Sequence, residues 1–361
     1  MQRFFILVLS SFLFISCYKE YQARDIQQIS ILNISIDSTS IRAIDAVDEN
    51  TAFYAGSNGI IGDVYMRKDD WSISLPEKIR YKDSMIPNYR SVASNGKDIF
   101  ALSIGNPALL TKFNAYETDP STQSDVMGSY RFVYKEAHEK VFYDSMKFFD
   151  AQNGIAMGDP TEDCLSIILS KDGGNTWQKI PCGKLPKVVE GEAAFAASNT
   201  NIKVIGKTAW IVTGGAKARI FKTTDLGKSW VVFDSPIISG NGPQGIYSVD
   251  FADENNGILI GGDYSNPTEN KANKAITKDG GKTWQLVADK REPAYKSCIQ
   301  FVPNTQGKEV FAVGFTGISY SKDGGLTWKE ISKEAYYAID FADRNHAWLA
   351  GKEKIGYLKL N

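Results

Sequence analysis

The sequence is poor in the residues that carry metal and redox chemistry. Its 361 residues include 4 cysteines and 2 histidines. The histidines, His138 and His346, lie far apart in the chain, and no two cysteines have the CxxC spacing of a metal or redox motif. No GxGxxG segment follows a predicted strand and precedes a helix, so nothing indicates a dinucleotide. We therefore expect no metal site, no cofactor and no catalytic residue.

The charge shows no excess of either sign. Lysine and arginine total 41, aspartate and glutamate total 42, and the formal net charge is −1. The sequence has neither a basic tail nor an acidic block. Nothing would attract a polyanion over a long distance, so we expect no nucleic-acid partner.

Long apolar runs are absent beyond the N-terminus. The opening MQRFFILVLSSFLFISC has one apolar run, from Phe4 to Ile15, which is too short for a bilayer span and is typical of a signal peptide. Its end, FISC, resembles a bacterial lipobox. The resemblance implies cleavage before Cys17, lipidation of Cys17, and a location in the bacterial cell envelope on the periplasmic or surface face. An ordinary signal peptide with an incidental cysteine is the alternative. We expect a signal peptide over 1–16 and a tether over 17–27.

One eight-residue pattern occurs four times. The copies are SKDGGNTW (170–177), TTDLGKSW (223–230), TKDGGKTW (277–284) and SKDGGLTW (321–328). Strand-like runs precede and follow each copy, so each copy predicts the turn of a β-hairpin. Glycine can adopt a positive φ at low cost, and the aspartate can accept hydrogen bonds from turn amides. The tryptophan then begins the returning strand, where its ring can fill a gap to a neighbouring sheet.

Two further strand signals precede each turn, and the second of them often ends in glycine. A unit of four antiparallel strands that recurs at this interval predicts a propeller blade. Units begin near residues 42, 89, 143, 192, 246, 295 and 336, which predicts an all-β, seven-bladed propeller over 28–361. The last unit has about three strands, so we expect the N-terminal run DIQQISILNIS to supply its fourth. The alternative is six blades, which would require that one of the two degenerate units, those that begin near residues 42 and 89, does not form a blade.

The SxDxGxTW pattern resembles the BNR or Asp-box repeats of bacterial sialidases. The degenerate seven-unit pattern looks most like the photosystem II stability/assembly factor type of propeller, over 191–200, 210–230 and 245–264 in particular. This resemblance implies a non-catalytic module that binds another envelope or membrane protein, with the lipid anchor as its contact with the membrane. The alternative partner is a glycan, bound or cleaved as a sialidase would cleave it.

Propellers usually bind ligands on the face opposite the repeated turns, so we expect Asp172, Asp225, Asp279 and Asp323 to be structural. We call the other face the mouth. Aromatic, acidic and basic side chains lie there, at the predicted start of the first strand of each unit and in the loop that follows its second strand. The binding residues that we select are Arg42, Arg90, Asp144, Asp159, Glu192, Arg219, Tyr247, Asp263, Tyr264 and Tyr337. Such a mixture suits a peptide or a sugar. The alternative is that the mouth is polar because it meets water.

A sialidase would need three arginines, for which Arg42, Arg90 and Arg219 are candidates, and an acid beside a nucleophilic tyrosine, such as Glu192 with Tyr247. The setting SIRAID around Arg42 lacks the proline and the aromatic residue of the sialidase motif, which weakens this reading.

Two cysteines flank the first repeated turn at equal distances. Cys164 and Cys182 lie nine residues before and after Gly173. Opposite positions of a hairpin lie within reach of a disulfide, and an exported protein can keep one. A bulge would shift the register and leave two buried thiols instead. We expect Cys298 to be a free, buried thiol.

Overall fold

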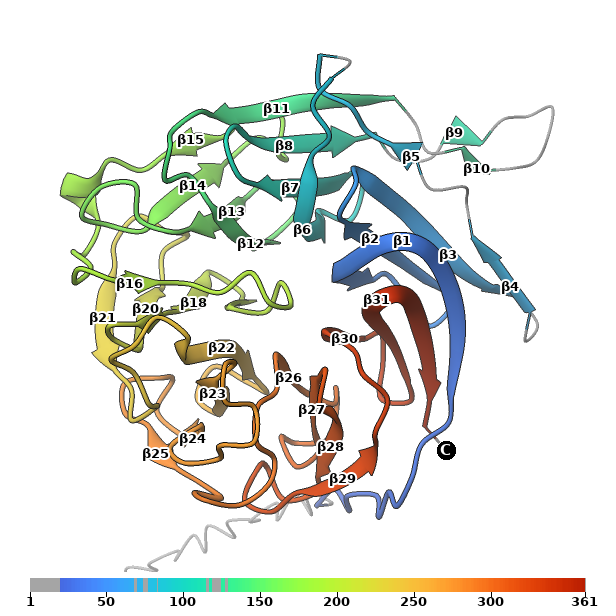
Figure 1. Ribbon diagram of the computed structural model, residues 1–361, viewed down its shortest axis with the longest axis vertical. Coiled ribbons are helices and arrows are strands. Elements are labelled where there is room, and N and C mark those ends of the chain that lie inside the picture. Colours follow the sequence, from blue (N-terminus) through green and yellow to red (C-terminus); the bar gives the residue numbers. More distant parts are fainter. Residues whose placement is uncertain are drawn as a thin grey trace, which may run out of the picture.

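The computed structural model describes residues 20–67, 70–73, 77–82, 84–114, 117–118, 125–126 and 129–360. Its strands form antiparallel sheets around a central axis, as Figure 1 shows. The prediction of an all-β propeller is therefore confirmed. The expected signal peptide and Cys17 lie outside the described residues. Within those residues, no helix has the length and apolar character needed to cross a membrane.

In the second, third, fourth and sixth sheets, the first strand in the chain lies near the axis and later strands lie progressively outward, as Figure 1 shows. The first sheet comprises β30 (Ala338–Phe341), β31 (His346–Lys359), β1 (Ile31–Ala46), β2 (Thr51–Gly56), β3 (Ile60–Arg67) and β4 (Asp70–Ile73), with β5 (Glu77–Lys78) paired to β3. The second comprises β6 (Asn88–Ser94), β7 (Ile99–Ile104), β8 (Ala108–Phe113) and β11 (Tyr130–Glu136). The third comprises β12 (Tyr143–Phe148), β13 (Gly154–Gly158), β14 (Ser166–Ser170) and β15 (Gln178–Lys179).

The remaining sheets follow the same antiparallel plan. The fourth comprises β17 (Ile202–Ile205), β18 (Thr208–Val212), β20 (Arg219–Thr223) and β21 (Val231–Asp234). The fifth comprises β22 (Gln244–Phe251), β23 (Gly257–Asp263), β24 (Lys274–Thr277) and β25 (Gln285–Leu286), extended by β19 (Gly214–Gly215) and β16 (Glu192–Ala193). The sixth comprises β26 (Cys298–Phe301), β27 (Val310–Gly314), β28 (Gly317–Ser321) and β29 (Lys329–Ser332). A small pair, β9 (Glu117–Thr118) and β10 (Asp125–Val126), lies between β8 and β11 in the chain.

The prediction of seven blades is wrong, because the described strands form six sheets of four or more strands. The expected first and last blades are not separate. Strands β1 and β31 are long and continuous, and they pair along their length, including Ser40 with Lys352 beyond an irregularity in register. This pairing joins the strands of both units into one seven-stranded sheet.

The N-terminal run does pair with the last strand of the chain. Residues from Ile31 to Ser35 of β1 pair with residues from Leu358 to Lys354 of β31. The later part of β1, from Ile41 to Ala46, pairs with β2. One strand therefore joins the end of the chain to its beginning, and the ring has no free edge at that point.

The four repeated turns connect the third and fourth strands of the third, fourth, fifth and sixth sheets. In the first turn, the Asp172 carboxylate accepts hydrogen bonds from the Thr176 backbone N–H (2.9 Å) and the Thr176 hydroxyl (2.7 Å). The Trp177 indole N–H donates to the Gly174 carbonyl at 3.2 Å. The same bonds recur at the other three turns. The turn aspartates therefore have local structural partners.

Each repeated turn also packs against the preceding sheet. Gly174 has φ +78°, and a Cβ at this position would lie 2.3 Å from the Phe100 ring of β7, so only glycine fits. Trp177 is buried and meets Phe100 and Phe148 edge-on, at ring-centroid distances of 6.4 and 5.8 Å. The contact with Phe100 of β7 buries aromatic surface between the second and third sheets, while Phe148 of β12 supports the Trp177 ring from within the third sheet.

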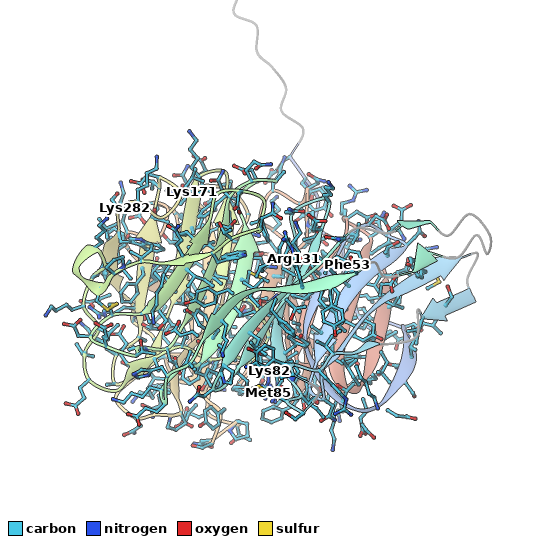
Figure 2. All side chains as sticks on the ribbon, turned by 90° about the horizontal axis from the view of Figure 1, so that it is seen from above. Phe53, Lys82, Met85, Arg131, Lys171 and Lys282 are labelled. Carbon is cyan, nitrogen blue, oxygen red and sulfur yellow. A yellow bond between two sulfur atoms is a disulfide. The ribbon has the colours of Figure 1, made fainter. Side chains whose placement is uncertain are left out.

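The propeller has two distinct faces. Figure 2 shows Lys171 and Lys282, from two repeated turns, on one side of the molecule, and Lys82 and Met85 on the other. We call the side with the repeated turns the turn face. The opposite side, where the inner strands begin, is the mouth face.

Candidate functional site

A segment of the chain crosses the axis of the propeller. Residues 194–201, which we call the hub segment, lie between β16 and β17, and Figure 1 shows the chain after β16 running into the centre of the ring. Asn199 is fully buried there. Its side-chain oxygen accepts hydrogen bonds from the hydroxyls of Ser91 (2.6 Å) and Ser145 (3.1 Å), and its amide donates to the Val92 carbonyl (2.8 Å).

The hub segment also contacts the opposite side of the ring. The Ser198 hydroxyl donates to the Ser297 carbonyl at 2.7 Å, and the Thr200 and Ser248 hydroxyls are 2.7 Å apart. These contacts, together with those of Asn199, tie the segment to inner strands on several sides of the axis. They close the floor of the mouth.

The expected start of a blade near residue 192 is therefore wrong. The inner strand of that unit is β17, which begins at Ile202, ten residues later. The run GEAAFAASNT contains small and polar residues that do not alternate as a half-buried strand would. Small side chains suit the narrow centre of the ring. The run of small residues is therefore the feature of the sequence that could have predicted the hub segment.

Two arginines lie above this floor. The Arg42 guanidinium donates to the Ala197 carbonyl at 3.3 Å and lies 3.9 Å from the centre of the Tyr337 ring. The Arg90 guanidinium donates to the Ala196 carbonyl at 3.2 Å. Burial and the neighbouring Arg42 charge lower the pKa of Arg90 to about 10. The structure thus brings three of the selected residues, Arg42, Arg90 and Tyr337, to one place.

Two neighbouring acids adjoin this place, and one of them, Asp144, interacts with the Arg90 charge. Asp144 is fully buried, and neither carboxylate oxygen has a hydrogen-bond partner among the described residues. Burial and the nearby Asp159 raise the pKa of Asp144 well above its ordinary value, although Arg90 acts in the opposite direction. Burial raises the pKa of Asp159 to about 6, even though its carboxylate accepts the Ala194 N–H at 2.8 Å. The two acids together retain a proton more readily than exposed acids do.

Aromatic side chains cover the adjoining part of the mouth. We define the aromatic patch as Phe195, Tyr247, Tyr264, Tyr295 and Phe315. Ring centroids are 4.5 Å apart for Phe195 and Tyr247, 5.1 Å for Tyr247 and Tyr295, and 4.8 Å for Tyr295 and Phe315. Tyr264 and Phe315 remain 51% and 45% exposed. The patch therefore has a buried base and two rings that a partner can reach.

Local hydrogen bonds hold Tyr264 in this position. Its backbone N–H donates to the Tyr247 hydroxyl at 3.0 Å. The Asp263 carboxylate accepts the Ser265 hydroxyl (2.5 Å) and backbone N–H (2.9 Å), and these bonds lower its pKa. Asp263 is thus a turn residue that positions its neighbour.

Glu192 and Arg219 form a separate ion pair. The Arg219 guanidinium lies 2.5 Å from the Glu192 carboxylate, whose side chain is completely buried, and the Thr213 hydroxyl donates to the same carboxylate at 2.7 Å. The Tyr247 hydroxyl instead donates to the Pro243 carbonyl. The Glu192–Tyr247 pair considered for sialidase chemistry is therefore not formed, and Arg219 is committed to Glu192.

The turn-face end of the axis holds a cavity of about 890 Å³. Each of six inner strands contributes one polar residue to its wall; these residues are Asp45, Lys147, Lys203, Asp250, Gln300 and Asp340. Sequence reasoning did not select them, although all except Lys203 occupy the next-to-last position of their strands.

These wall residues connect neighbouring strands. Lys203 lies 2.5 Å from Asp250, and the Gln300 amide donates to Asp340 at 2.8 Å. Asp250 also accepts the Phe301 N–H at 2.7 Å, and Asp340 accepts the Ala46 N–H at 2.8 Å. The charged groups in the cavity therefore stabilise the ring by linking neighbouring inner strands.

One group of described residues could approach a cation. Donor atoms of Glu49, Asp343 and His346 lie within 4.8 Å of one another. Asp343, however, already accepts the backbone N–H groups of Asn345 and His346, at 2.6 and 2.8 Å. Asp150 and Asp253 form the same turn in other sheets without a histidine. A repeated structural turn explains the arrangement.

A disulfide joins Cys164 and Cys182, with 5.4 Å between their Cα atoms. Their symmetry about Gly173 predicts that the two residues lie opposite each other in the strands of the hairpin. In the structure, both lie outside those strands. Cys164 pairs with Lys187, and Cys182 begins the short 3-10 helix η1 (Cys182–Lys184). The bond therefore connects the segments that flank the hairpin. Cys298 is a buried, free thiol.

Comparison with known proteins identifies the fold. No protein-family model matches the chain, and no curated protein matches it in sequence. Among solved structures, the chain is similar to "YCF48 bound to D1 peptide", with a TM-score of 0.62, 14% identity, and coverage of 93% of this chain and 100% of that one. It is similar to YCF48 from Cyanidioschyzon merolae (TM-score 0.61, 11% identity, 92% and 98% coverage). It is also similar to the WD40 β-propeller domain of Doa1 (TM-score 0.59, 11% identity, 93% and 98% coverage). At these identities the likeness shows the β-propeller fold alone.

Proposed function

We propose that this protein is a lipid-anchored propeller of the bacterial cell envelope that binds a segment of another envelope or membrane protein on its mouth face. The binding surface comprises the exposed rings of the aromatic patch and the neighbouring Arg42 and Arg90. The protein acts as an assembly or holding module and performs no catalysis.

The closed floor of the mouth is the observation that carries this proposal. Because the hub segment fills the axis beneath Arg42 and Arg90, the mouth offers a surface rather than a deep, enclosed pocket. Exposed aromatic rings beside charged groups are typical of protein-binding surfaces. Tyr264 and Phe315 supply such rings. The hydrogen bond from the Tyr264 backbone N–H to the Tyr247 hydroxyl holds the Tyr264 backbone in place, which lowers the entropic cost of binding through this residue.

The comparison structures support the same class of partner. One similar propeller, YCF48, is described with a bound D1 peptide. A similar propeller is thus able to bind a peptide, and a peptide segment can offer the apolar and acidic groups that exposed rings and arginines bind.

Capture of partners from membranes tests the proposal. The tagged protein is cross-linked in its own membranes, purified and compared with the Tyr264→Ala/Phe315→Ala variant by mass spectrometry. Both side chains are about half exposed, so the variant should fold normally and lose the captured partner. Val231→Ala/Leu326→Ala is the matched control, since these residues are 53% and 52% exposed on the turn face. An unchanged set of partners for the mouth variant would contradict the proposal.

The lipid anchor has its own test. Cys17→Ser should release the protein from the membrane fraction, because a soluble body is otherwise held only by the lipid. A Cys17→Ser protein that remains in washed membranes would contradict this part of the proposal.

Glycoside cleavage is the second candidate, and the Asp144–Asp159 pair is the observation that favours it. A glycosidase needs two acids, one with a raised pKa, and both members of this pair have raised pKa values. Asp144, however, is fully buried and cannot touch a sugar in this conformation. Hydrolysis of chromogenic glycosides between about pH 4 and 7, abolished by Asp159→Asn, would favour this candidate over a binding module.

A further inference from the structure

The first described residues are docked on the propeller. We call residues 20–27 the clasp segment. The Lys308 ammonium lies 2.7 Å from the Glu20 carboxylate, and the Tyr21 N–H donates to Gln306 at 3.0 Å. The Lys322 ammonium lies 2.8 Å from the Asp25 carboxylate. Contacts thus begin at the first residue that the structure describes.

A buried carboxylate holds the middle of the clasp segment. Glu309, at the entry to β27, has a completely buried side chain. It accepts hydrogen bonds from the Tyr21 hydroxyl (2.6 Å), the Arg24 backbone N–H (2.8 Å) and the Arg24 guanidinium (2.6 Å). The Tyr320 hydroxyl donates back to the Arg24 carbonyl at 2.9 Å. Since Glu309 would otherwise be a buried charge without a cation, the clasp segment is part of the folded body.

The clasp segment lies on the turn face. Its partners Gln306, Lys308 and Glu309 come from the loop between β26 and β27, and Lys322 belongs to the fourth repeated turn. This is the side on which Figure 2 shows Lys171 and Lys282, opposite Lys82. The chain therefore enters the propeller from the face that does not carry the aromatic patch.

The sequence between the expected lipid and the clasp segment is short. Cys17 and Glu20 are three residues apart, and an extended chain spans at most about 3.6 Å per residue, or roughly 11 Å here. We infer that the clasp segment holds the turn face against the membrane and directs the mouth face away from it. This inference rests on the lipid anchor of the proposed function.

The turn face also presents exposed lysines on the side where the chain enters. These lysines belong to the repeated turns and include Lys171, Lys228 and Lys282. The carboxylates in the same turns stay ionised, because, although burial acts in the opposite direction, hydrogen bonds from turn amides and hydroxyls lower the pKa values of Asp172, Asp225 and Asp279. Lysines near a membrane surface are attracted to anionic lipid headgroups. The exposed lysines of this face can therefore contact lipid headgroups, while the clasp segment and the short spacer, rather than a net positive charge, set the orientation.

Lysine accessibility tests the orientation. The native, full-length lipoprotein is reconstituted in vesicles of phosphatidylethanolamine and phosphatidylglycerol and labelled with a membrane-impermeant amine reagent. Labelling of each lysine is measured by mass spectrometry before and after detergent is added. We expect Lys171 and Lys282 to be labelled several-fold more slowly in vesicles than in detergent, with Lys82 unchanged. Equal labelling of both faces, or protection of Lys82 alone, would overturn the inference.

A longer tether supplies the matched variant. Insertion of about 20 glycine and serine residues between Lys19 and Glu20 gives a coil with a root-mean-square length of roughly 25 Å, without altering the clasp segment. We expect this variant to remain on the vesicles and to lose the protection of Lys171 and Lys282. The same insertion after Asn266, in an exposed loop, should leave the protection intact. Protection that persists with the long tether would mean that the short spacer does not set the orientation.

The outcomes separate this inference from the proposed function. If the native protein fails to associate with vesicles, the lipid anchor and the orientation both fail. If it associates but Lys82 is the protected lysine, the orientation alone fails. If the orientation holds and the mouth variant still captures every partner, the binding proposal alone fails.

Discussion

Loss of the Arg24 side chain should destabilise the protein far more than its position near the N-terminus suggests. Arg24→Ala removes the guanidinium that donates to Glu309 at 2.6 and 2.9 Å and leaves that carboxylate, which has no exposed surface, without a cation. Breaking a buried ion pair by removal of one partner costs about 3–5 kcal/mol. The Tyr21 hydroxyl remains as a donor, so we expect a loss near the lower end of that range.

Urea unfolding followed by tryptophan fluorescence measures this loss. Lys322→Ala is the matched control, because it breaks another ion pair of the same segment in which both side chains are more than half exposed. Such pairs contribute about 0–1 kcal/mol. The effect of Arg24→Ala should also shrink in a Glu309→Gln background, where no buried charge is left unpaired. Equal, small losses for Arg24→Ala and Lys322→Ala would refute the reasoning and would show that the clasp segment is only loosely attached.

Three further outcomes can be measured. Trp177→Ala should lower the free energy of unfolding by about 3–5 kcal/mol, because the buried Trp177 ring fills the gap to Phe100 and Phe148. Partner capture by the folded fraction should stay unchanged. Lost capture at unchanged stability would contradict a structural role for Trp177. Asp144 and Asp159 have raised pKa values in the folded protein, so the stability that their protons contribute is present below about pH 4, the pKa of an unfolded aspartate. This stability is lost as the pH rises through the folded pKa values, which is about 6 for Asp159. Asp144→Asn should therefore raise the melting temperature at neutral pH and have a smaller effect near pH 4.5, and calorimetry that shows the reverse would exclude this assignment. Replacement of Cys164 and Cys182 by serine should cost about 3 kcal/mol in the chain-entropy description of an 18-residue separation, and unchanged urea unfolding would argue against the bond.

The repeated turns could be predicted because their structure is local. Each turn aspartate bonds to groups within four residues of itself, so the eight-residue pattern contains nearly all of the interaction. The strand order within each sheet follows from the same local repeat. The number of sheets could not be read in this way, because it depends on whether β1 and β31 continue through two units, and that is set by long-range pairing.

The candidate site was predicted in part. Arg42, Arg90 and Tyr337 meet because each stands near the start of an inner strand, and the strand pattern places such positions together around the axis. The pairing of Glu192 with Arg219 could not be predicted, because the sequence does not reveal that the hub segment takes the place of the expected inner strand. The sequence predicts only a tether over 17–27, because the contacts of the clasp segment join residues almost 300 positions apart, such as Tyr21 with Glu309.

The hub segment has a consequence for how the chain folds. Its hydrogen-bond partners lie 155 residues away at Arg42, 108 at Ser91 and 99 at Ser297, so they come from strands on different sides of the ring. These contacts can form only when strands made early and late in the chain have already assembled around residues 194–201. Contacts of such long sequence separation slow folding, because the entropy of closing large loops is lost before the contacts form. We expect closure of the ring around the hub segment to be the last and slowest step, so that Asn199→Ala would accelerate unfolding while early assembly of the sheets proceeds at its normal rate.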